Sequence, residues 1–213
     1  MYPYLDHIVL VCRDLDAGAR RFEALTGVRP RLGGVHAGGR THNALARIGP
    51  RCYLEILAPT GPPNAADDLW CRIAHATREL AVLTYCLRSR RPLTSLASLA
   101  LDSGWKDAQV APNGRTTPEG IALHWQWLAP KVDGLDLAFP FFIDWLDSPH
   151  PADTITQAGK QETLTLQEFA VRHPEAARLR AILAELGTPI DTVQAESPGF
   201  VLVLETPKGR VAL

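Results

Sequence analysis

The sequence has few cysteines, and none of them lies in a paired motif. Its 213 residues include four, at Cys12, Cys52, Cys71 and Cys86, with no C-x-x-C spacing. Disulfide frameworks and structural zinc sites both need clustered or regularly spaced cysteines. The four therefore resemble small buried hydrophobes in a reducing compartment, and the cytoplasm is the expected location.

Long apolar runs and a leader segment are lacking as well. No stretch approaches the roughly 18 apolar residues of a membrane span. Residues 1–4 lead directly into a strand-like segment, with neither a basic nor an apolar leader region. We therefore expect no secretory signal and no membrane partner.

A strong charge of one sign is also absent. The 22 basic and 23 acidic residues are interspersed and give a formal net charge of −1. Nucleic acid and anionic membrane surfaces are not expected partners of such a chain. The Gly-rich stretch 33–40 fits neither the P-loop motif nor G-x-G-x-x-G, so no nucleotide cofactor is expected.

Two short β-type runs each carry one ligand-capable side chain among apolar residues. The first is 5–11 with His7, and the second is 52–57 with Glu55. Alternate residues of a strand share one face, so each of these side chains lies on an apolar stripe. If the two strands face one cavity, a histidine and a carboxylate meet there.

The order of elements recurs along the chain. Glycines suited to ending a helix stand at Gly27, Gly104 and Gly187, and each of these helices follows a β-type run. We predict further strands over 121–128 and 137–145, and a hairpin formed by 199–205 and 210–213. The predicted division is a first βαβββ module at 1–60, a linker at 61–79, a second module at 80–150 and a C-terminal βα-plus-strands unit at 160–213.

The last predicted strands of the first two modules each carry one acid. Tyr53-Leu54-Glu55-Ile56-Leu57 corresponds to Phe142-Ile143-Asp144-Trp145-Leu146. A carboxylate in so apolar a strand is costly to bury unless it is paired, hydrogen-bonded or bound to metal. Two such acids in equivalent places suggest a site, although an ordinary α+β domain with an accidental rhythm is the alternative.

These segments resemble a known family, the vicinal oxygen chelate superfamily, and most closely its glyoxalase-like branch. The resemblance is best over residues 4–60 and extends over 80–146. The segments that carry it are Leu5-Asp6-His7-Ile8-Val9, Asp14-Leu15, Thr26-Gly27, Thr41-x-Asn43-x-Leu45, Ile48-Gly49 and Tyr53-Leu54-Glu55-Ile56. It implies an α+β fold in which repeated βαβββ modules form a half-open mixed β-barrel with helices outside.

The resemblance also implies one divalent metal ion held by His7, Glu55 and Asp144. The fourth expected ligand is missing, because residues 80–83 offer only apolar side chains, and His124 is a substitute from a neighbouring strand. Such a mixed nitrogen and oxygen set suits Fe, Mn, Ni or Zn. Glu55 or Asp144 would double as a base. Each of the three residues also has a structural alternative. His7 would be a hydrogen-bonded residue at the rim of the barrel, Glu55 a structural hydrogen-bonding acid, and Asp144 a capping acid in a loop.

Further residues are candidates for binding the substrate. His36, His42 and Asn43 surround the Gly-rich turn, which would let the backbone approach a ligand closely or would serve chain reversal alone. His124 and Gln126 share one strand face. Trp125 lies between them and supplies either an aromatic wall or core packing.

Three functions are compatible with these observations. The first is a metal-dependent lyase, isomerase or dioxygenase acting on a small oxygen-rich molecule. The second is a protein of the same fold that binds an antibiotic or metabolite without chemistry, and the third is an interaction module with a decayed site. The expected partner is a small molecule, with a homodimer as an alternative assembly. Three roles are open for the C-terminal unit, which are completing the barrel, covering it and forming a dimer contact.

Overall fold

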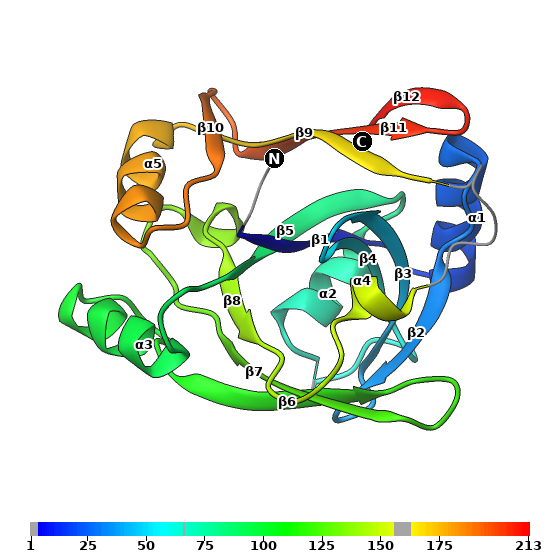
Figure 1. Cartoon of the computed structure of the whole chain (residues 1–213), viewed down its shortest axis with the longest axis horizontal. Coiled ribbons are helices and arrows are strands. Elements are labelled where there is room, and N and C mark those ends of the chain that lie inside the picture. The colour runs from blue at the N-terminus through cyan, green and yellow to red at the C-terminus, as the bar shows by residue number, and fades with distance from the viewer. Residues whose placement is uncertain (1–3, 66, 156–162) are drawn as a thin grey trace.

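The computed structural model describes residues 4–65, 67–155 and 163–213 as a β-barrel with helices outside it and a smaller sheet against it (Figure 1). The first module contains β1 (Leu5–Val11), α1 (Leu15–Thr26), β2 (Arg31–His36), β3 (Thr41–Gly49) and β4 (Cys52–Pro59). Asp14 caps α1 by accepting the Ala17 N–H at 2.7 Å. Gly27 ends the helix in the left-handed region, at φ 80°, where glycine carries no steric penalty.

The second module repeats this order after a short helix. The elements are α2 (Leu69–Ala76), β5 (Ala81–Arg88), α3 (Leu93–Asp102), β6 (Val110–Thr116), β7 (Ala122–Leu128), the 3-10 turn η1 (Asp136–Ala138), β8 (Phe141–Asp144) and α4 (Pro151–Thr154). The strand predicted over 137–145 is shorter than expected, because η1 occupies its first part and Pro140, just before β8, has no N–H to donate.

The eight strands of the two modules close into one ring, in the order β1-β4-β3-β2-β6-β7-β8-β5. The modules join at two seams: β1 pairs antiparallel with β5, and β2 pairs with β6 through Val35–Thr116 and His36–Arg115. The prediction of an α+β fold with a mixed barrel of repeated modules is confirmed. The domain boundaries drawn from the sequence stay a prediction.

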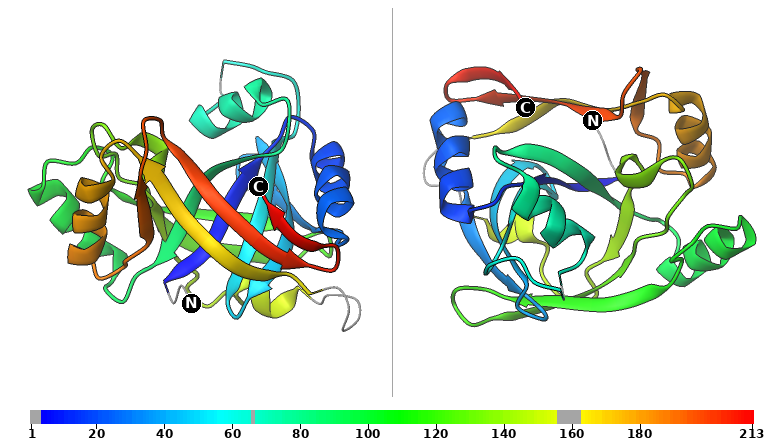
Figure 2. Two further views of the ribbon diagram at one scale, coloured as in Figure 1. Left: turned by 90° about the horizontal axis from the view of Figure 1, so that it is seen from above. Right: turned by 180° about the vertical axis from the view of Figure 1, so that it is seen from behind.

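The C-terminal unit covers the outside of the barrel (Figure 2). It consists of β9 (Thr165–His173), α5 (Ala176–Glu185), β10 (Asp191–Gln194), β11 (Gly199–Thr206) and β12 (Gly209–Ala212), with sheet order β10-β9-β11-β12. The Phe169 ring packs edge-on against Tyr85 of β5, with ring centroids 5.2 Å apart. The unit therefore extends the outer core and contributes no strand to the ring.

Two apolar clusters result from the alternation of strand residues. The outer one packs the barrel against α1, α3 and the C-terminal sheet, and the inner one fills the barrel. Val9, Tyr53 and Trp125 belong to the inner cluster, whereas Ile8 and Leu54 belong to the outer one. Strand alternation therefore decides which polar side chains enter the barrel. Among the described helices, none is long and apolar enough to cross a membrane.

Candidate functional site

A cavity of about 150 Å³ lies inside the barrel. That volume is below the range of roughly 300–1,000 Å³ found for drug-sized ligands, so the space suits a small molecule. Residues from both modules and from α2 line it, among them His7, His36, Thr41, Asn43, Tyr53, Glu55, Trp70, Arg115, Trp125, Trp127, Phe141, Ile143 and Trp145.

His7 and Glu55 meet in this cavity, as their strand faces predict. β1 and β4 run parallel, with His7 opposite Tyr53 and Val9 opposite Glu55. The His7 Nε2 atom lies 3.5 Å from Oε2 of Glu55, and both side chains are buried. The His7 ring stacks on Tyr53 with centroids 4.6 Å apart, which fixes the plane of the imidazole.

A buried carboxylate orients His7 from behind. Asp6 is fully buried, and its Oδ1 atom lies 2.8 Å from Nδ1 of His7. Its Oδ2 atom lies 3.1 Å from Nε2 of His150 and 3.3 Å from Nη1 of Arg88. Burial raises the pKa of Asp6, but hydrogen bonds and charge from His150 and His7 outweigh burial and lower it below the usual range. Asp6 is therefore ionised and keeps a proton on Nδ1 of His7.

Glu55 is held on its other side by Asn43 and His36. Asn43 Nδ2 donates to Oε1 of Glu55 at 2.6 Å, and His36 Nε2 lies 3.4 Å from the same oxygen. Thr41 Oγ1 fixes His36 through Nδ1 at 2.9 Å. Burial raises the pKa of Glu55, but the contacts with His36, His7 and Asn43 lower it to about 2. Glu55 is thus a stable carboxylate and a weak base at neutral pH.

This carboxylate makes the stability of the metal-free protein depend on pH. The folded pKa of Glu55 is about 2, against 4.5 in the unfolded chain, so its contribution is present above pH 4.5 and lost as the pH falls toward 2. We expect the wild type to lose about 3 kcal/mol more unfolding free energy than Glu55→Gln between pH 6 and pH 2. Urea unfolding in EDTA measures this difference. Parallel pH profiles for the two proteins would contradict the lowered pKa.

Three of the residues predicted for the site lie on the opposite face of their strands. His124 and Asp144 are exposed, and Gln126 of β7 pairs with Asp144 of β8 on the barrel exterior. Asp144 Oδ1 accepts the N–H of Leu146 at 3.0 Å, which is the loop-capping arrangement. The structure therefore does not bring Asp144, His124 or Gln126 to His7 and Glu55.

The physical reason is the period of two in a strand. If the inward face of a strand is assigned one residue too early or too late, every side chain expected inside the barrel points outside it. Trp125, Trp127 and Ile143 point inward in place of the three predicted residues. His42 is displaced for the same reason, because Asn43 beside it points inward. Burial is the main cause that lowers the pKa of half-buried His42, and the residue does not line the cavity.

The register shows what the second module offers in place of a histidine and an acid. β5 and β8 pair in parallel with Cys86 opposite Phe141, just as His7 stands opposite Tyr53. Two residues further along β8 is Ile143, the counterpart of Glu55. Burial, with the charges of Asp6 and Glu55, raises the pKa of Cys86 well above its usual value, so its thiol is protonated. At these equivalent positions the first module therefore supplies a histidine and a carboxylate, and the second supplies Cys86 and Ile143.

Besides Asp6, three polar contributors to this region were not among the site residues predicted from the sequence. Arg115 is buried beside Asn43, and Trp145 Nε1 donates to Asp6 at 3.3 Å. His150 caps α4 through Nδ1 while its other nitrogen faces Asp6. The sequence hint for His150 is the His-Pro pair that opens α4, and no local pattern indicates Arg115.

Comparison with known proteins gives one family and a set of similar structures. The model of a glyoxalase-like domain matches residues 5–187. No curated protein matches the chain. A hypothetical protein from Staphylococcus aureus superposes with a TM-score of 0.65 at 17% identity, covering 94% of this chain and 80% of that one. At this identity the likeness shows the fold.

Two methylmalonyl-CoA epimerases are also among the matches. The Streptomyces coelicolor enzyme has a TM-score of 0.47 and 18% identity, covering 71% of this chain and 100% of the other. The Mycobacterium tuberculosis enzyme has a TM-score of 0.42 and 14% identity, covering 66% and 85%.

Proposed function

Because the chain belongs to the family of glyoxalase-like domains, we propose that it is an enzyme that uses a divalent metal ion at His7 and Glu55. Its substrate is a small oxygen-rich molecule held in the barrel cavity, and the reaction is that of a lyase, isomerase or dioxygenase. The observation that carries the proposal is the approach of His7 Nε2 to Glu55 Oε2 at 3.5 Å.

The donor atoms of these two residues fit a cation. Asp6 is a carboxylate and only accepts, so Nδ1 of His7 carries the proton of that contact and Nε2 is left for Glu55. Nε2 faces the ionised Oε2 of Glu55, where a proton on the imidazole balances the carboxylate in the metal-free protein and a divalent ion would take the place of that proton. Two acceptors face each other favourably only when a proton or a metal ion lies between them. A carboxylate behind a histidine is also the usual support of a metal-binding imidazole.

The remaining cavity residues have separate roles. A bound divalent ion would supply Lewis-acid polarisation of a substrate oxygen. Asn43 keeps Glu55 in place. The lowered pKa of Glu55 makes this carboxylate better suited to binding a cation than to accepting a proton. His36 is partly exposed at the cavity and held by Thr41, so it is the group placed to carry a proton. The aromatic walls exclude water.

Metal content tests the proposal directly. We expect the purified wild type, reconstituted with Fe, Mn, Ni or Zn and freed of excess ion, to retain about one ion per chain. His7→Ala and Glu55→Ala should each reduce the retained metal at least tenfold, because each removes a ligand. Elemental analysis is the measurement. Asp144→Asn is the matched control, since this exposed acid lies outside the cavity and its loss should leave the metal content unchanged.

A wild type that retains no metal after reconstitution would contradict the proposal. Equal retention by the wild type and His7→Ala would also contradict it.

The second candidate function is a non-catalytic binding protein, which the aromatic lining of the cavity favours. The ring centroids of Trp125 and Trp145 lie 5.1 Å apart, and those of Trp70 and Trp127 lie 5.7 Å apart. These indole rings would offer stacking surfaces to a flat apolar ligand.

A further inference from the structure

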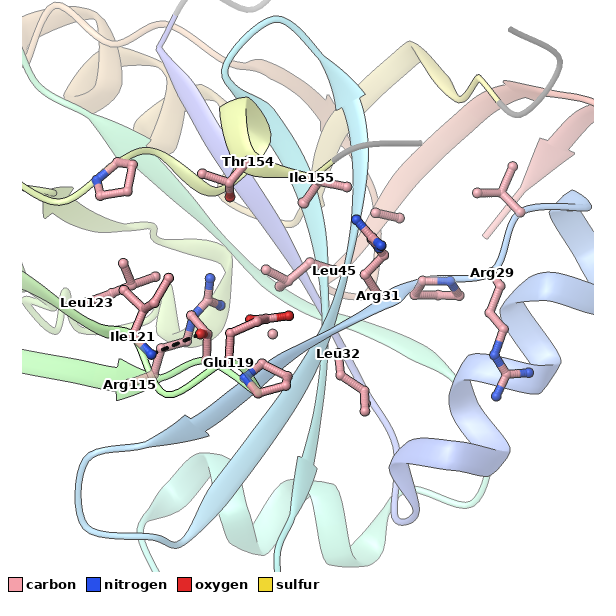
Figure 3. A pocket seen from close by; sticks show the side chains of 17 residues that line it. Arg29, Arg31, Leu32, Leu45, Arg115, Glu119, Ile121, Leu123, Thr154 and Ile155 are labelled. Carbon is pink, nitrogen blue, oxygen red and sulfur yellow. Dashed lines mark hydrogen bonds between the residues drawn. The ribbon is translucent and has the colours of Figure 1, made fainter. Parts of the chain in front are cut away.

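A second and larger hollow, which we call the arginine groove, opens beside the inner cavity. It encloses about 730 Å³ and is lined by Arg29, Arg31, Arg115, Leu32, Ile121 and Ile155, among others (Figure 3). Leu32 and Ile121 are 66% and 58% exposed, so their apolar surface is open to a ligand. Arg115 lines both the groove and the inner cavity.

Arg115 is a buried cation without an ionic partner in the described part of the chain. Only 6% of the residue is exposed. Its Nη1 atom contacts Oδ1 of Asn43 at 3.4 Å, a weak neutral contact, while Nε has no hydrogen-bond partner. Within residues 4–65, 67–155 and 163–213, no carboxylate lies within 4.0 Å of its guanidinium. Burying such a charge unpaired is costly, so the position favours an anion.

The backbone beside Arg115 leaves room for this arrangement. A Cβ atom on Gly33 would overlap Oδ1 of Asn43 and would lie 2.9 Å from Nη1 of Arg115. Glycine at this place therefore lets β2 pass close to the guanidinium. Any larger residue would push Arg115 or Asn43 away.

The other two arginines of the groove differ from Arg115. Arg29 is more than half exposed and already pairs with Glu23 at 2.8 Å and Asp16 at 3.2 Å. Arg31 lies on β2, and its charge adds a smaller effect to the hydrogen bonds from the backbone and Thr117 that lower the pKa of Glu119. These two contribute positive charge at the rim, whereas Arg115 is the one held inside.

We propose that the arginine groove binds an elongated ligand with an apolar body and a terminal oxyanion, and that Arg115 binds the oxyanion. The apolar body packs on Leu32, Ile121 and Ile155. A planar guanidinium matches both carboxylate and phosphate, so either end group satisfies this chemistry. The inference deepens and rests on the proposed function, because Arg115 also lines the inner cavity, so the charged end of the substrate would reach that cavity while its apolar body extends along the groove.

Binding of simple probes to the whole chain in EDTA tests the inference independently of any metal. Isothermal titration at constant ionic strength would compare hexanoate, hexyl phosphate and neutral hexanamide. We expect at least one of the two anions to bind roughly 10- to 100-fold more tightly than hexanamide, as a charged hydrogen bond in a buried site implies. The stronger of the two anions identifies the end group.

Variants separate an anion-binding role from a structural one. Arg115→Met should lower the affinity for the anion at least tenfold and leave hexanamide binding unchanged, while Arg115→Lys should lie between. Without ligand, the Tm of Arg115→Met should equal or exceed that of the wild type, because an unpaired buried charge has been removed. Arg210→Gln is the control, because this exposed arginine of β12 lies outside the groove, and it should bind like the wild type.

Three results would overturn the inference. They are equal affinity of the wild type for the anions and hexanamide, no binding of either anion at millimolar concentration, and unchanged anion affinity in folded Arg115→Met. If Arg115→Met does not fold, the inference is decided by comparing the affinities of the wild type for the anions and for hexanamide. Loss of metal binding by His7→Ala would not affect any of these readings, so the two proposals fail separately.

Discussion

Replacing Gly34 with alanine is expected to lower the unfolding free energy by about 4 kcal/mol or more, an exceptional loss for one methyl group. Gly34 lies in β2 at φ 128°, a region that residues with a side chain rarely adopt. A Cβ atom here would overlap the carbonyl oxygen of Thr116 and lie 2.7 Å from its carbonyl carbon. Because that obstacle is backbone, β2 and β6 must separate.

This seam has little redundancy. β2 and β6 pair through Val35–Thr116 and His36–Arg115, followed by one hydrogen bond from the Ala37 N–H to the Gly114 carbonyl at 2.7 Å, so a local separation opens the barrel between its two modules. The same separation displaces His36 of the inner cavity and Arg115, which lines both the inner cavity and the arginine groove. We therefore expect Gly34→Ala to lose metal retention and anion binding together with its stability.

Two other glycines provide matched controls in urea unfolding. Gly38 has φ 86° with nothing within 4 Å of a new Cβ, so Gly38→Ala should cost only about 1 kcal/mol from backbone strain. Gly49 lies in β3, and its new Cβ would meet only Cβ of Cys52 at 3.7 Å, so Gly49→Ala should change stability little. Similar losses for Gly34→Ala and Gly38→Ala would show that the clash with Thr116 is relieved cheaply.

Much of this fold was predictable because its signals are local. Asp14 and Gly27 mark the two ends of α1, and the structure places a side-chain cap and a left-handed residue there. The apolar β-type runs around His7 and Glu55 indicate buried strands. The attachment of the C-terminal sheet to the outside of the barrel was not predictable, since it depends on contacts such as Phe169 with Tyr85, far apart in the sequence.

The candidate site was predictable in its first half only. His7 and Glu55 meet because each is the one polar residue on an inward stripe. Asp144 and His124 look equivalent in sequence, but β7 and β8 turn their neighbouring aromatic and aliphatic residues inward. Choosing a face requires the register, and the register depends on pairing between strands. Arg115 was missed for the related reason that its surroundings come from two other strands.

Replacing Asp6 with asparagine should cost about 3 kcal/mol or more at neutral pH, because one carboxylate supports four buried or half-buried groups. Oδ1 of Asp6 contacts His7, and Oδ2 contacts His150, Arg88 and Trp145. These partners come from β1, β5 and the segment after β8, so Asp6 joins both modules at one end of the barrel. An amide keeps the shape but removes the charge that His7 and Arg88 face.

The pH dependence of this loss identifies its electrostatic origin. The pKa of Asp6 is lowered on folding, so its contribution is fully present above pH 3.8, the unfolded value, and disappears as the pH falls through the folded value. The stability difference between the wild type and Asp6→Asn should therefore shrink in acid. Urea unfolding at pH 7 and at pH 3 measures it, and Asp16→Asn is the control, because this exposed acid pairs only at the surface.

Asp6→Asn should also weaken metal retention without removing a ligand. An amide oxygen still accepts from Nδ1 of His7, but it supplies no negative charge to make Nε2 more basic, and losses of roughly 10- to 100-fold in affinity are usual for such a change. A variant that loses stability but retains metal as the wild type does would make Asp6 a purely structural link. If Asp6→Asn loses both stability and metal retention while Asp16→Asn loses neither, then one buried carboxylate supports both the stability of the barrel and the metal binding of His7.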